Sequence, residues 1–135
     1  LKNRFVAEFV GRNNIVKGKI KTLNQNKAVI DTESGLFTVV LGQSQKVKVG
    51  EDATFVIAAD LVRLTNAKPT AENVIACSLI SEEFVGSVVT LFLESPDGQE
   101  FKVQVQERHL AEINLKVDGS LYLSWPSKSA HLLPA

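Results

Sequence analysis

Turn-forming residues interrupt this sequence about every ten residues, a spacing typical of small all-β domains. The segments between the turns are short, apolar and rich in β-branched residues, which favours strands over helices. In the first half the predicted strands are Lys27–Asp31, Leu36–Leu41, Ala53–Ile57 and the closing segment Leu61–Leu64. Strands of this length become stable only when several of them pair and cover a common core. The chain is therefore expected to be all-β.

The opening of the chain, residues 3–20, changes from a helical pattern to a strand pattern. One face of a helical turn is indicated by the spacing of four apolar residues, Phe5, Val6, Phe9 and Val10. Gly11 is predicted to end this helix in a left-handed conformation. From Ile15 to Leu23 apolar residues alternate with lysines, as in a half-buried strand. A helix this short is not stable alone, so it is interpreted as the end of a helix that begins upstream.

The second half repeats the same kind of pattern after a polar stretch with a proline, Asn66–Asn73, which is the predicted linker. Pro96-Asp97-Gly98 is a strong signal for a hairpin turn. Glu107–Leu115 is predicted to form a short helix. The predicted strands of this half are Val74–Ile80, Val85–Glu94, Gln99–Gln106, Ser120–Trp125 and Ala130–Leu133.

The two halves follow one plan, which indicates an internal repeat. Asn14 and Asn73 each stand at the start of a strand, and further strands follow in the same order. Five-stranded units of this size commonly close as small Greek-key barrels of the oligonucleotide/oligosaccharide-binding (OB) type. The predicted fold is two tandem five-stranded OB-like barrels or half-barrels with short flanking helical segments, and exchange of strands between them is left open. The predicted segments are a linker helix (1–12), a first module (13–65), a linker (66–73) and a second module (74–135).

Charge and composition exclude several classes of protein. The 15 basic and 15 acidic residues cancel, so the chain lacks the general positive charge typical of nucleic-acid binders. Most phenylalanines occupy apolar positions that suggest a core, so an OB barrel that stacks nucleic-acid bases is disfavoured and no nucleic-acid partner is expected. No apolar run approaches the roughly 20 residues of a membrane span. A single cysteine, Cys77, cannot form an internal disulfide, which fits a reducing compartment.

Motifs for catalysis are absent from the sequence. No serine, cysteine or lysine stands in a recognisable activating context. Gly11 and Gly18-Lys19 superficially suggest a phosphate-binding loop, but the spacing is too long and Ile20 replaces the required serine or threonine. His109 and His131 lack companion ligands, so no metal site is predicted. The chain by itself is expected to be neither an enzyme nor a cofactor-binding protein.

Several segments resemble the C-terminal regulatory domain of ATP-binding subunits in bacterial and archaeal ABC importers. The opening NRFVAEFVGRNN resembles the junction after the nucleotide-binding domain. FVIAADLVRL (55–64) and SWPSKSAHLL (124–133) resemble the endings of the two halves of that domain, the transport-associated OB type. Gly86-Ser87 after Phe84 is similar to a strand of its second half. One departure is Ala58-Ala59-Asp60, where many sugar and polyamine subunits have Arg-Pro-Glu.

This resemblance implies a regulatory and dimerisation domain that tethers two ATPase domains and senses cargo or a regulatory protein. The parent subunit would be a transport ATPase, and its missing domain would bind ATP and Mg. The expected partners are a second copy of the subunit, the membrane permease and a small-molecule or anion regulator. The expected location is the cytoplasmic face of the cell membrane. The sequence has no methionine, so the chain is interpreted as part of a longer protein.

The first half also resembles molybdate-binding modules, in which an Arg-Asn turn leads into a Lys-Gly-Lys strand. Turn amides, asparagine side chains and a nearby cation can bind a tetrahedral oxyanion. The candidate residues for a molybdate, tungstate or sulfate site are Arg12, Asn13, Asn14 and Lys17. The alternative is that the two asparagines only shape the turn. Oxyanion binding therefore stands as the second functional hypothesis.

Overall fold

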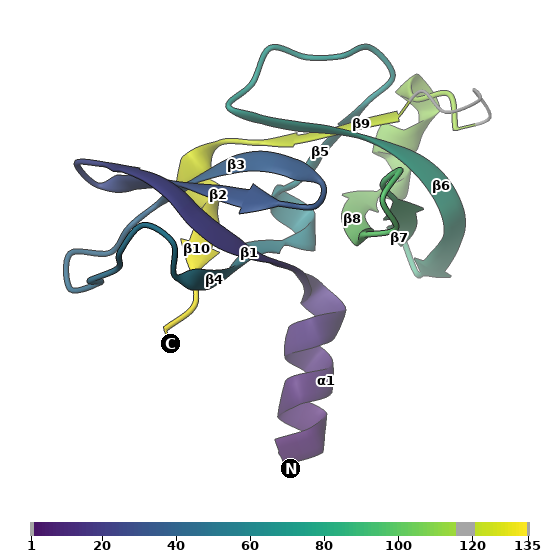
Figure 1. The fold of residues 1–135 in the computed structure, drawn as a ribbon. Helices are drawn as coiled ribbons and strands as arrows, with labels where there is room; N and C mark the ends of the chain where they lie inside the picture. The colour runs from purple at the N-terminus through teal and green to yellow at the C-terminus, as the bar shows by residue number, and fades with distance from the viewer. Residues whose placement is uncertain (1, 116–120, 135) are drawn as a thin grey trace.

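The computed structural model describes residues 2–115 and 121–134 and consists of two β-sheets with one protruding helix (Figure 1). The first half contains α1 (Lys2–Arg12), β1 (Asn13–Asn24), β2 (Lys27–Thr32), β3 (Gly35–Val40), β4 (Asp52–Ala58), the 3-10 turn η1 (Ala59–Leu61) and β5 (Arg63–Thr65). The second half contains β6 (Asn73–Val85), β7 (Val88–Glu94), β8 (Glu100–Gln106), η2 (Glu107–Glu112), β9 (Leu121–Trp125), η3 (Ser127–Ser129) and β10 (Ala130–Leu132). The all-β prediction is confirmed.

Each half gives one strand to the sheet of the other half. The first sheet is a closed barrel in the order β1-β2-β3-β10-β4, and the second is a five-stranded sheet in the order β5-β9-β6-β7-β8. β10 comes from the end of the chain and pairs with β3 and β4, while β5 pairs antiparallel with β9. The strand exchange left open by the sequence is therefore present. It makes the folding of each sheet depend on the other half of the chain.

β1 curves around the barrel because it changes partners along its length. Residues 13–19 pair with β4, and residues 19–24 pair with β2, with a bulge between Ile20 and Thr22. Gly18 precedes Lys19, the residue that pairs with both strands, and a Cβ atom on Gly18 would stand 2.3 Å from the carbonyl oxygen of Asp31. A side chain at this position would collide with the backbone of β2. β6 repeats this design, with a bulge between Leu79 and Ser81.

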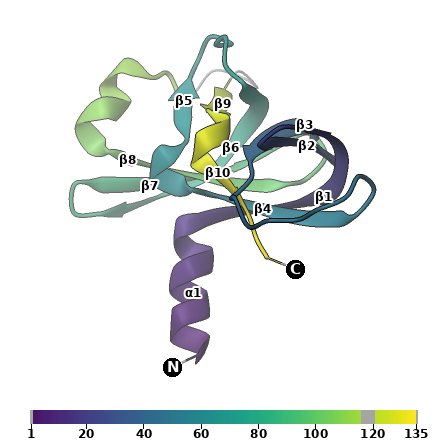
Figure 2. The ribbon, with the colours of Figure 1, turned by 90° about the vertical axis from the view of Figure 1, so that its left-hand side faces the viewer.

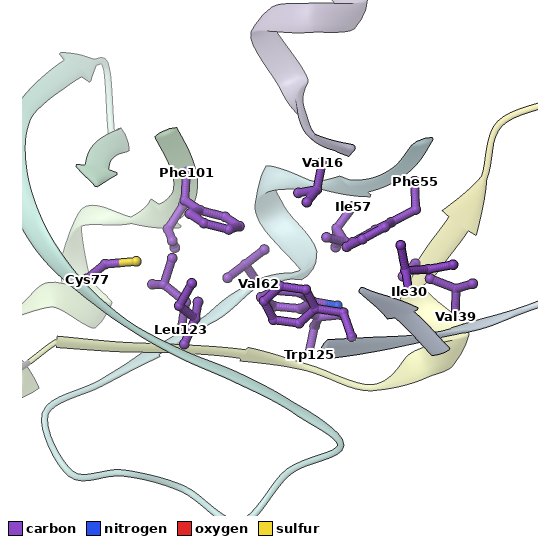
Figure 3. Packing of buried hydrophobic residues seen from close by; sticks show 14 of the residues in the cluster. Val16, Ile30, Val39, Phe55, Ile57, Val62, Cys77, Phe101, Leu123 and Trp125 are labelled. Carbon is purple, nitrogen blue, oxygen red and sulfur yellow. The ribbon is translucent and has the colours of Figure 1, made fainter. Parts of the chain in front are cut away.

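The core runs continuously from the barrel into the second sheet, and Trp125 lies at its centre (Figure 3). The Trp125 ring stacks on Phe37 of the barrel at a centroid distance of 5.2 Å and lies 6.2 Å from Phe101 of β8. Its indole nitrogen is buried and has no hydrogen-bond partner among the described residues. Large buried aromatic side chains contribute much of the packing energy of a core, so Trp125 stabilises the contact between the two halves.

Asparagine side chains make a second connection, and they do so symmetrically. Asn14 at the start of β1 donates to the Lys102 carbonyl oxygen at 2.9 Å and accepts from the Lys102 amide at 2.6 Å. Asn73 at the start of β6 makes the same pair of bonds to Thr38, at 3.0 and 2.8 Å. Lys102 and Thr38 lie on the third strand of their respective halves. Each side chain extends the hydrogen-bonding pattern of a strand in the opposite half.

Two predictions about glycines were wrong. α1 continues through Gly11 to Arg12, and Gly11 is not among the residues with a positive φ angle. The helix ends where Asn13 begins β1 and donates its side-chain amide to the carbonyl oxygen of Phe9 at 2.9 Å. Gly86 and Ser87 do not lie in a strand but form the turn between β6 and β7, where Gly86 has a φ angle of 61°. A glycine tolerates this left-handed conformation without the steric cost other residues incur.

The boundaries of other predicted elements differ less from those in the structure. The segment expected to be a helix at Glu107–Leu115 is a 3-10 turn over Glu107–Glu112. The first residue of the predicted strand Ser120–Trp125 lies outside the described residues. The Asn66–Asn73 stretch is held at its start, because the Asn66 side chain makes two hydrogen bonds of 2.8 Å to the backbone of Asn114.

Candidate functional site

The four residues predicted to bind an oxyanion lie on α1 and β1, but the structure does not gather them in one pocket. Asn14 is buried and both ends of its amide are occupied by the Lys102 backbone. Asn13 uses its amide group to cap α1. Arg12 lies 3.3 Å from the carboxylate of Glu8. Arg12 and Asn13 line one cavity, whereas Lys17 lines another.

The cavity beside Arg12 and Asn13 measures about 370 Å³ and lies where α1, η1 and β8 meet. Asp60 and Gln104 contribute to its wall, together with Phe9 and the Glu8 carboxylate. The guanidinium group and the amides suit an anion, but the two carboxylates counter their charge. The cavity is therefore lined by both positively and negatively charged groups.

The cleft beside Lys17 is larger, about 810 Å³, and separates the barrel from the turn between β7 and β8. Lys19 lies 2.8 Å from the Asp52 carboxylate, and this hydrogen bond and charge lower the pKa of Asp52. On the facing wall, Asp97 accepts hydrogen bonds from Ser95 and, at 2.9 Å, from Ser34. The hydrogen bond from Ser95 makes the larger contribution to lowering the pKa of Asp97, and the bond from Ser34 makes a smaller contribution. The bond between Ser34 and Asp97 joins the β2–β3 turn to the equivalent turn of the other half.

Helix α1 is attached to both halves at its C-terminal end. β1 follows it directly, and the Lys102 ammonium group donates a hydrogen bond to the carbonyl oxygen of Val10. Burial lowers the pKa of Lys102. A cation at this end of a helix is favourable because the last carbonyl groups carry partial negative charge. The direction of α1 is therefore fixed by β8 as well as by β1, and Figure 2 shows the helix extending away from both sheets.

The end of the β6–β7 hairpin exposes large apolar side chains. We call residues 80–87 the β6–β7 tip and residues 21–26, at the end of the β1–β2 hairpin, the β1–β2 tip. Ile80, Phe84 and Val85 have exposed fractions of 61%, 52% and 67%. The sequence pattern places apolar residues in a core, so it gave no sign of this exposure. The missed signal was Gly86-Ser87, a turn pair that puts the preceding residues at a hairpin end.

Within the part of the chain that the structure describes, no group of three or more His, Cys, Asp or Glu side chains could hold a metal ion. Over the same residues, no helix has the length and apolar character needed to cross a membrane.

Comparison with known families places more than half of the chain in one family. The family model for the TOBE domain matches residues 55–133, which include the segments at the end of each half. The chain belongs to the TOBE domain family. The resemblance drawn from the sequence is thereby confirmed.

Curated relatives of this TOBE domain are ATP-binding proteins of importers. The chain is 27% identical to the spermidine/putrescine import ATP-binding protein PotA of Rubrobacter xylanophilus, over 97% of this chain and 34% of that protein. It is 22% identical to PotA of Nitrosomonas eutropha, over 97% of this chain and 37% of that protein. The chain thus spans about a third of the length of these relatives.

The TOBE domain also shares its fold with a solved structure, the cytoplasmic molybdate-binding protein ModG with molybdate bound. The match has a TM-score of 0.80 at 20% sequence identity and covers 90% of this chain and 96% of that one. It confirms the OB-like architecture of two joined halves.

Proposed function

We propose that this TOBE domain is the C-terminal regulatory and dimerisation domain of the ATP-binding subunit of an ABC importer. The observation that carries the proposal is the alignment of 97% of this chain with the C-terminal part of PotA. By itself the domain is not an enzyme. ATP and Mg bind elsewhere in the parent subunit, which faces the cytoplasm and contacts a membrane permease and a second copy of itself.

The attachment of α1 supports a regulatory role. Lys102 of β8 and Asn13 of β1 both bind backbone carbonyl groups near the C-terminal end of the helix. A shift of the second sheet relative to the barrel therefore changes the direction of α1. In the proposed setting α1 joins the ATPase domain to the regulatory domain, so such a shift reaches the site of ATP hydrolysis.

The reading frame upstream of Leu1 in the source genome tests this proposal. We expect it to continue into a sequence with a phosphate-binding loop and an ABC signature motif. A stop codon or a start codon directly before Leu1 would contradict the proposal. If the longer subunit exists, Lys102→Met should change its ATPase rate, whereas Lys128→Met, an exposed lysine on η3, should leave the rate unchanged.

Oxyanion binding in the cavity lined by Arg12 and Asn13, without Asn14 and Lys17, is the second candidate. It is supported by the fold shared with a molybdate-binding protein and by the placement of Arg12 and Asn13 in one cavity. Calorimetric titration with molybdate, tungstate and sulfate tests it. Saturable heat that is lost in Arg12→Gln supports the candidate, and no heat with any of the three anions removes it.

A further inference from the structure

The first sheet is closed into a barrel by one pair of residues between β3 and β10. His131 of β10 pairs in parallel with Val40 of β3, and β10 also pairs with β4. The Gln45 side chain holds this closure, because it donates a hydrogen bond of 2.8 Å to the carbonyl oxygen of Leu132. The η3 turn, which leads into β10, packs against β3. Closure of the barrel therefore depends on a short strand that follows a 3-10 turn.

The second half contains the same parts in equivalent places. η1 packs against β8 as η3 packs against β3, and β5 follows η1 as β10 follows η3. Arg63 of β5 is the counterpart of His131, because each is the second residue after its 3-10 turn. Gln104 of β8 is the counterpart of Val40, since each lies two residues beyond the position that an asparagine side chain binds in its strand. The second half thus has the strands needed for the same closure.

β5 and β8 nevertheless do not pair, because β5 pairs with β9 and β8 pairs with β7. We call the unpaired position between Arg63 and Gln104 the open seam. The Lys102 backbone binds the side chain of Asn14, so its amide and carbonyl groups point away from β7. The backbone groups of Gln104, two residues further along β8, point the same way. β8 therefore presents a free strand edge on the side where β5 would complete the ring.

No clamp like that of Gln45 holds the second half in either form. Among the described residues, no side chain binds the carbonyl oxygen of Leu64, the counterpart of Leu132 in the barrel. The nearest side-chain bonds lie past the seam, where Asn66 binds the backbone of Asn114 in an exposed position. Pairing of β5 with β8 would add few hydrogen bonds, and each contributes little net stability. The open and closed forms are therefore expected to be close in free energy.

Closure of the seam would reach α1 through β8. The Lys102 ammonium group donates a hydrogen bond to the carbonyl oxygen of Val10, and Lys102 is two residues from the seam at Gln104. Gln104 also lines the cavity between α1, η1 and β8, opposite Asp60 of η1. A movement of β8 towards β5 therefore changes both the direction of α1 and the shape of this cavity.

We propose that the second half alternates between this open sheet and a closed barrel, in which β5 pairs with β8 at Arg63 and Gln104. The closed form repeats the geometry that the first half already shows. The inference rests on the proposed function and deepens it, because it names the movement that redirects α1. A molecule in the cavity would favour one form through its contacts with Asp60 and Gln104.

Pairs of introduced cysteines test whether β5 reaches β8. We expect Arg63→Cys/Gln104→Cys to form a disulfide under mild oxidation, because paired strands bring Cα atoms within the span of a disulfide, about 4.4–6.8 Å. Val40→Cys/His131→Cys, across the closed position of the barrel, is the positive control. Arg63→Cys/Thr90→Cys is the negative control, since Thr90 pairs with Gln104 from β7 and lies one strand further from β5.

The native cysteine does not compete in this experiment. Cys77 is buried, and burial raises the pKa of its thiol to about 12, so it is not a reactive thiolate. Absence of the disulfide in Arg63→Cys/Gln104→Cys, under conditions that fully oxidise Val40→Cys/His131→Cys, would overturn the proposal.

Relaxation-dispersion NMR of the native chain tests whether the two forms interconvert. We expect exchange at the amides of Arg63, Gln104 and Val10, and its loss once the cysteine pair at the open seam is cross-linked. Lys102→Met should keep the exchange at Arg63 and Gln104 but remove it at Val10, because this variant cuts the link to α1. A native chain without exchange at the open seam would overturn the proposal. The test of the reading frame upstream of Leu1 is independent of these results.

Discussion

The two halves of this domain share one strand plan, yet one closes into a barrel and the other remains an open sheet. In the first half β10 joins β3 to β4 and completes the ring. In the second half β5 pairs with β9 only, so β5 and β8 are the outer strands of the sheet. The closed half has a polar hairpin tip, and the open half has an apolar one. The two halves therefore share a strand plan but differ in closure and in the chemistry of their hairpin tips.

What the halves retain in common is the way each binds the other. Asn14 and Asn73 occupy equivalent positions and bind equivalent strands across the junction. Side-chain amides that satisfy a backbone donor and acceptor together are costly to remove, since both groups would be left buried and unpaired. The junction is symmetric even though the outer surfaces are not.

The largest expected effect is from Trp125→Ala, which removes the side chain between Phe37 and Phe101. Truncation of a buried tryptophan costs about 3–5 kcal/mol. Because the core is shared, the free energy of unfolding should fall for both halves together, in one transition followed by urea denaturation. Trp125→Phe should cost much less, since it keeps a ring and removes an unsatisfied indole donor. Separate transitions for the two halves would contradict the shared core.

Next in size are the substitutions Asn14→Ala and Asn73→Ala. Each leaves one backbone amide and one carbonyl group without a partner, a loss of about 3 kcal/mol for two buried groups. The symmetry of the junction predicts similar losses for both variants. Asn66→Ala, whose bonds to Asn114 are exposed, should cost less. Thermal unfolding of the three variants measures these losses. Clearly unequal losses for Asn14→Ala and Asn73→Ala would show that the junction is symmetric in geometry but not in energy.

Substitution of two glycines by alanine should change the stability of the domain in opposite directions. Gly18→Ala places a methyl group against the Asp31 carbonyl oxygen and should destabilise the barrel by about 2 kcal/mol, a typical cost of overpacking. Gly11→Ala has nothing within 4 Å and lies in a helix, so it should stabilise α1 by about 0.5–1 kcal/mol. Circular dichroism melting curves of both variants test this. A stabilised Gly18→Ala would show that β1 does not cross β2 so closely.

A smaller, pH-dependent effect is expected at Glu72, beside the start of β6. The hydrogen bond from the Ser127 backbone amide, followed by bonds from Lys27 and the Ser127 hydroxyl, lowers the pKa of Glu72 from 4.5 to about 2. A pKa that is lower in the folded state adds stability above pH 4.5, and this stability is lost as the pH falls towards 2. Urea midpoints measured between pH 5 and 2 should show a shallower decline for Glu72→Gln than for the wild type. Glu51→Gln, an exposed control, should decline like the wild type.

Much of this fold could be predicted from the sequence because its strands are short and apolar residues alternate clearly with polar residues along them. The turn at Pro96-Asp97-Gly98 and the repeated asparagines are local signals, and the family resemblance rests on such local segments. The closure of the barrel by β10 was not predictable, because it depends on contacts between residues far apart in the chain. β10 and the barrel strand β4 are separated by most of the second half.

The candidate site was harder to predict than the fold. Arg12, Asn13, Asn14 and Lys17 are close in sequence, but neighbouring strand residues point to opposite faces and so reach different surroundings. The exposed tip was missed because Ile80, Phe84 and Val85 fit a core strand as well as they fit a contact surface. The Gly86-Ser87 turn pair, which puts these residues at a hairpin end, is the sequence signal that distinguishes the two cases.

Hydrogen exchange of the intact chain tests most directly whether the two halves form one cooperative unit around their shared core. Core amides of the barrel strands and of the second sheet should open with the same free energy as urea is added. Amides of the two hairpin tips should exchange faster, because they lie at exposed ends. A barrel that stays protected while the second sheet exchanges freely would contradict the shared core.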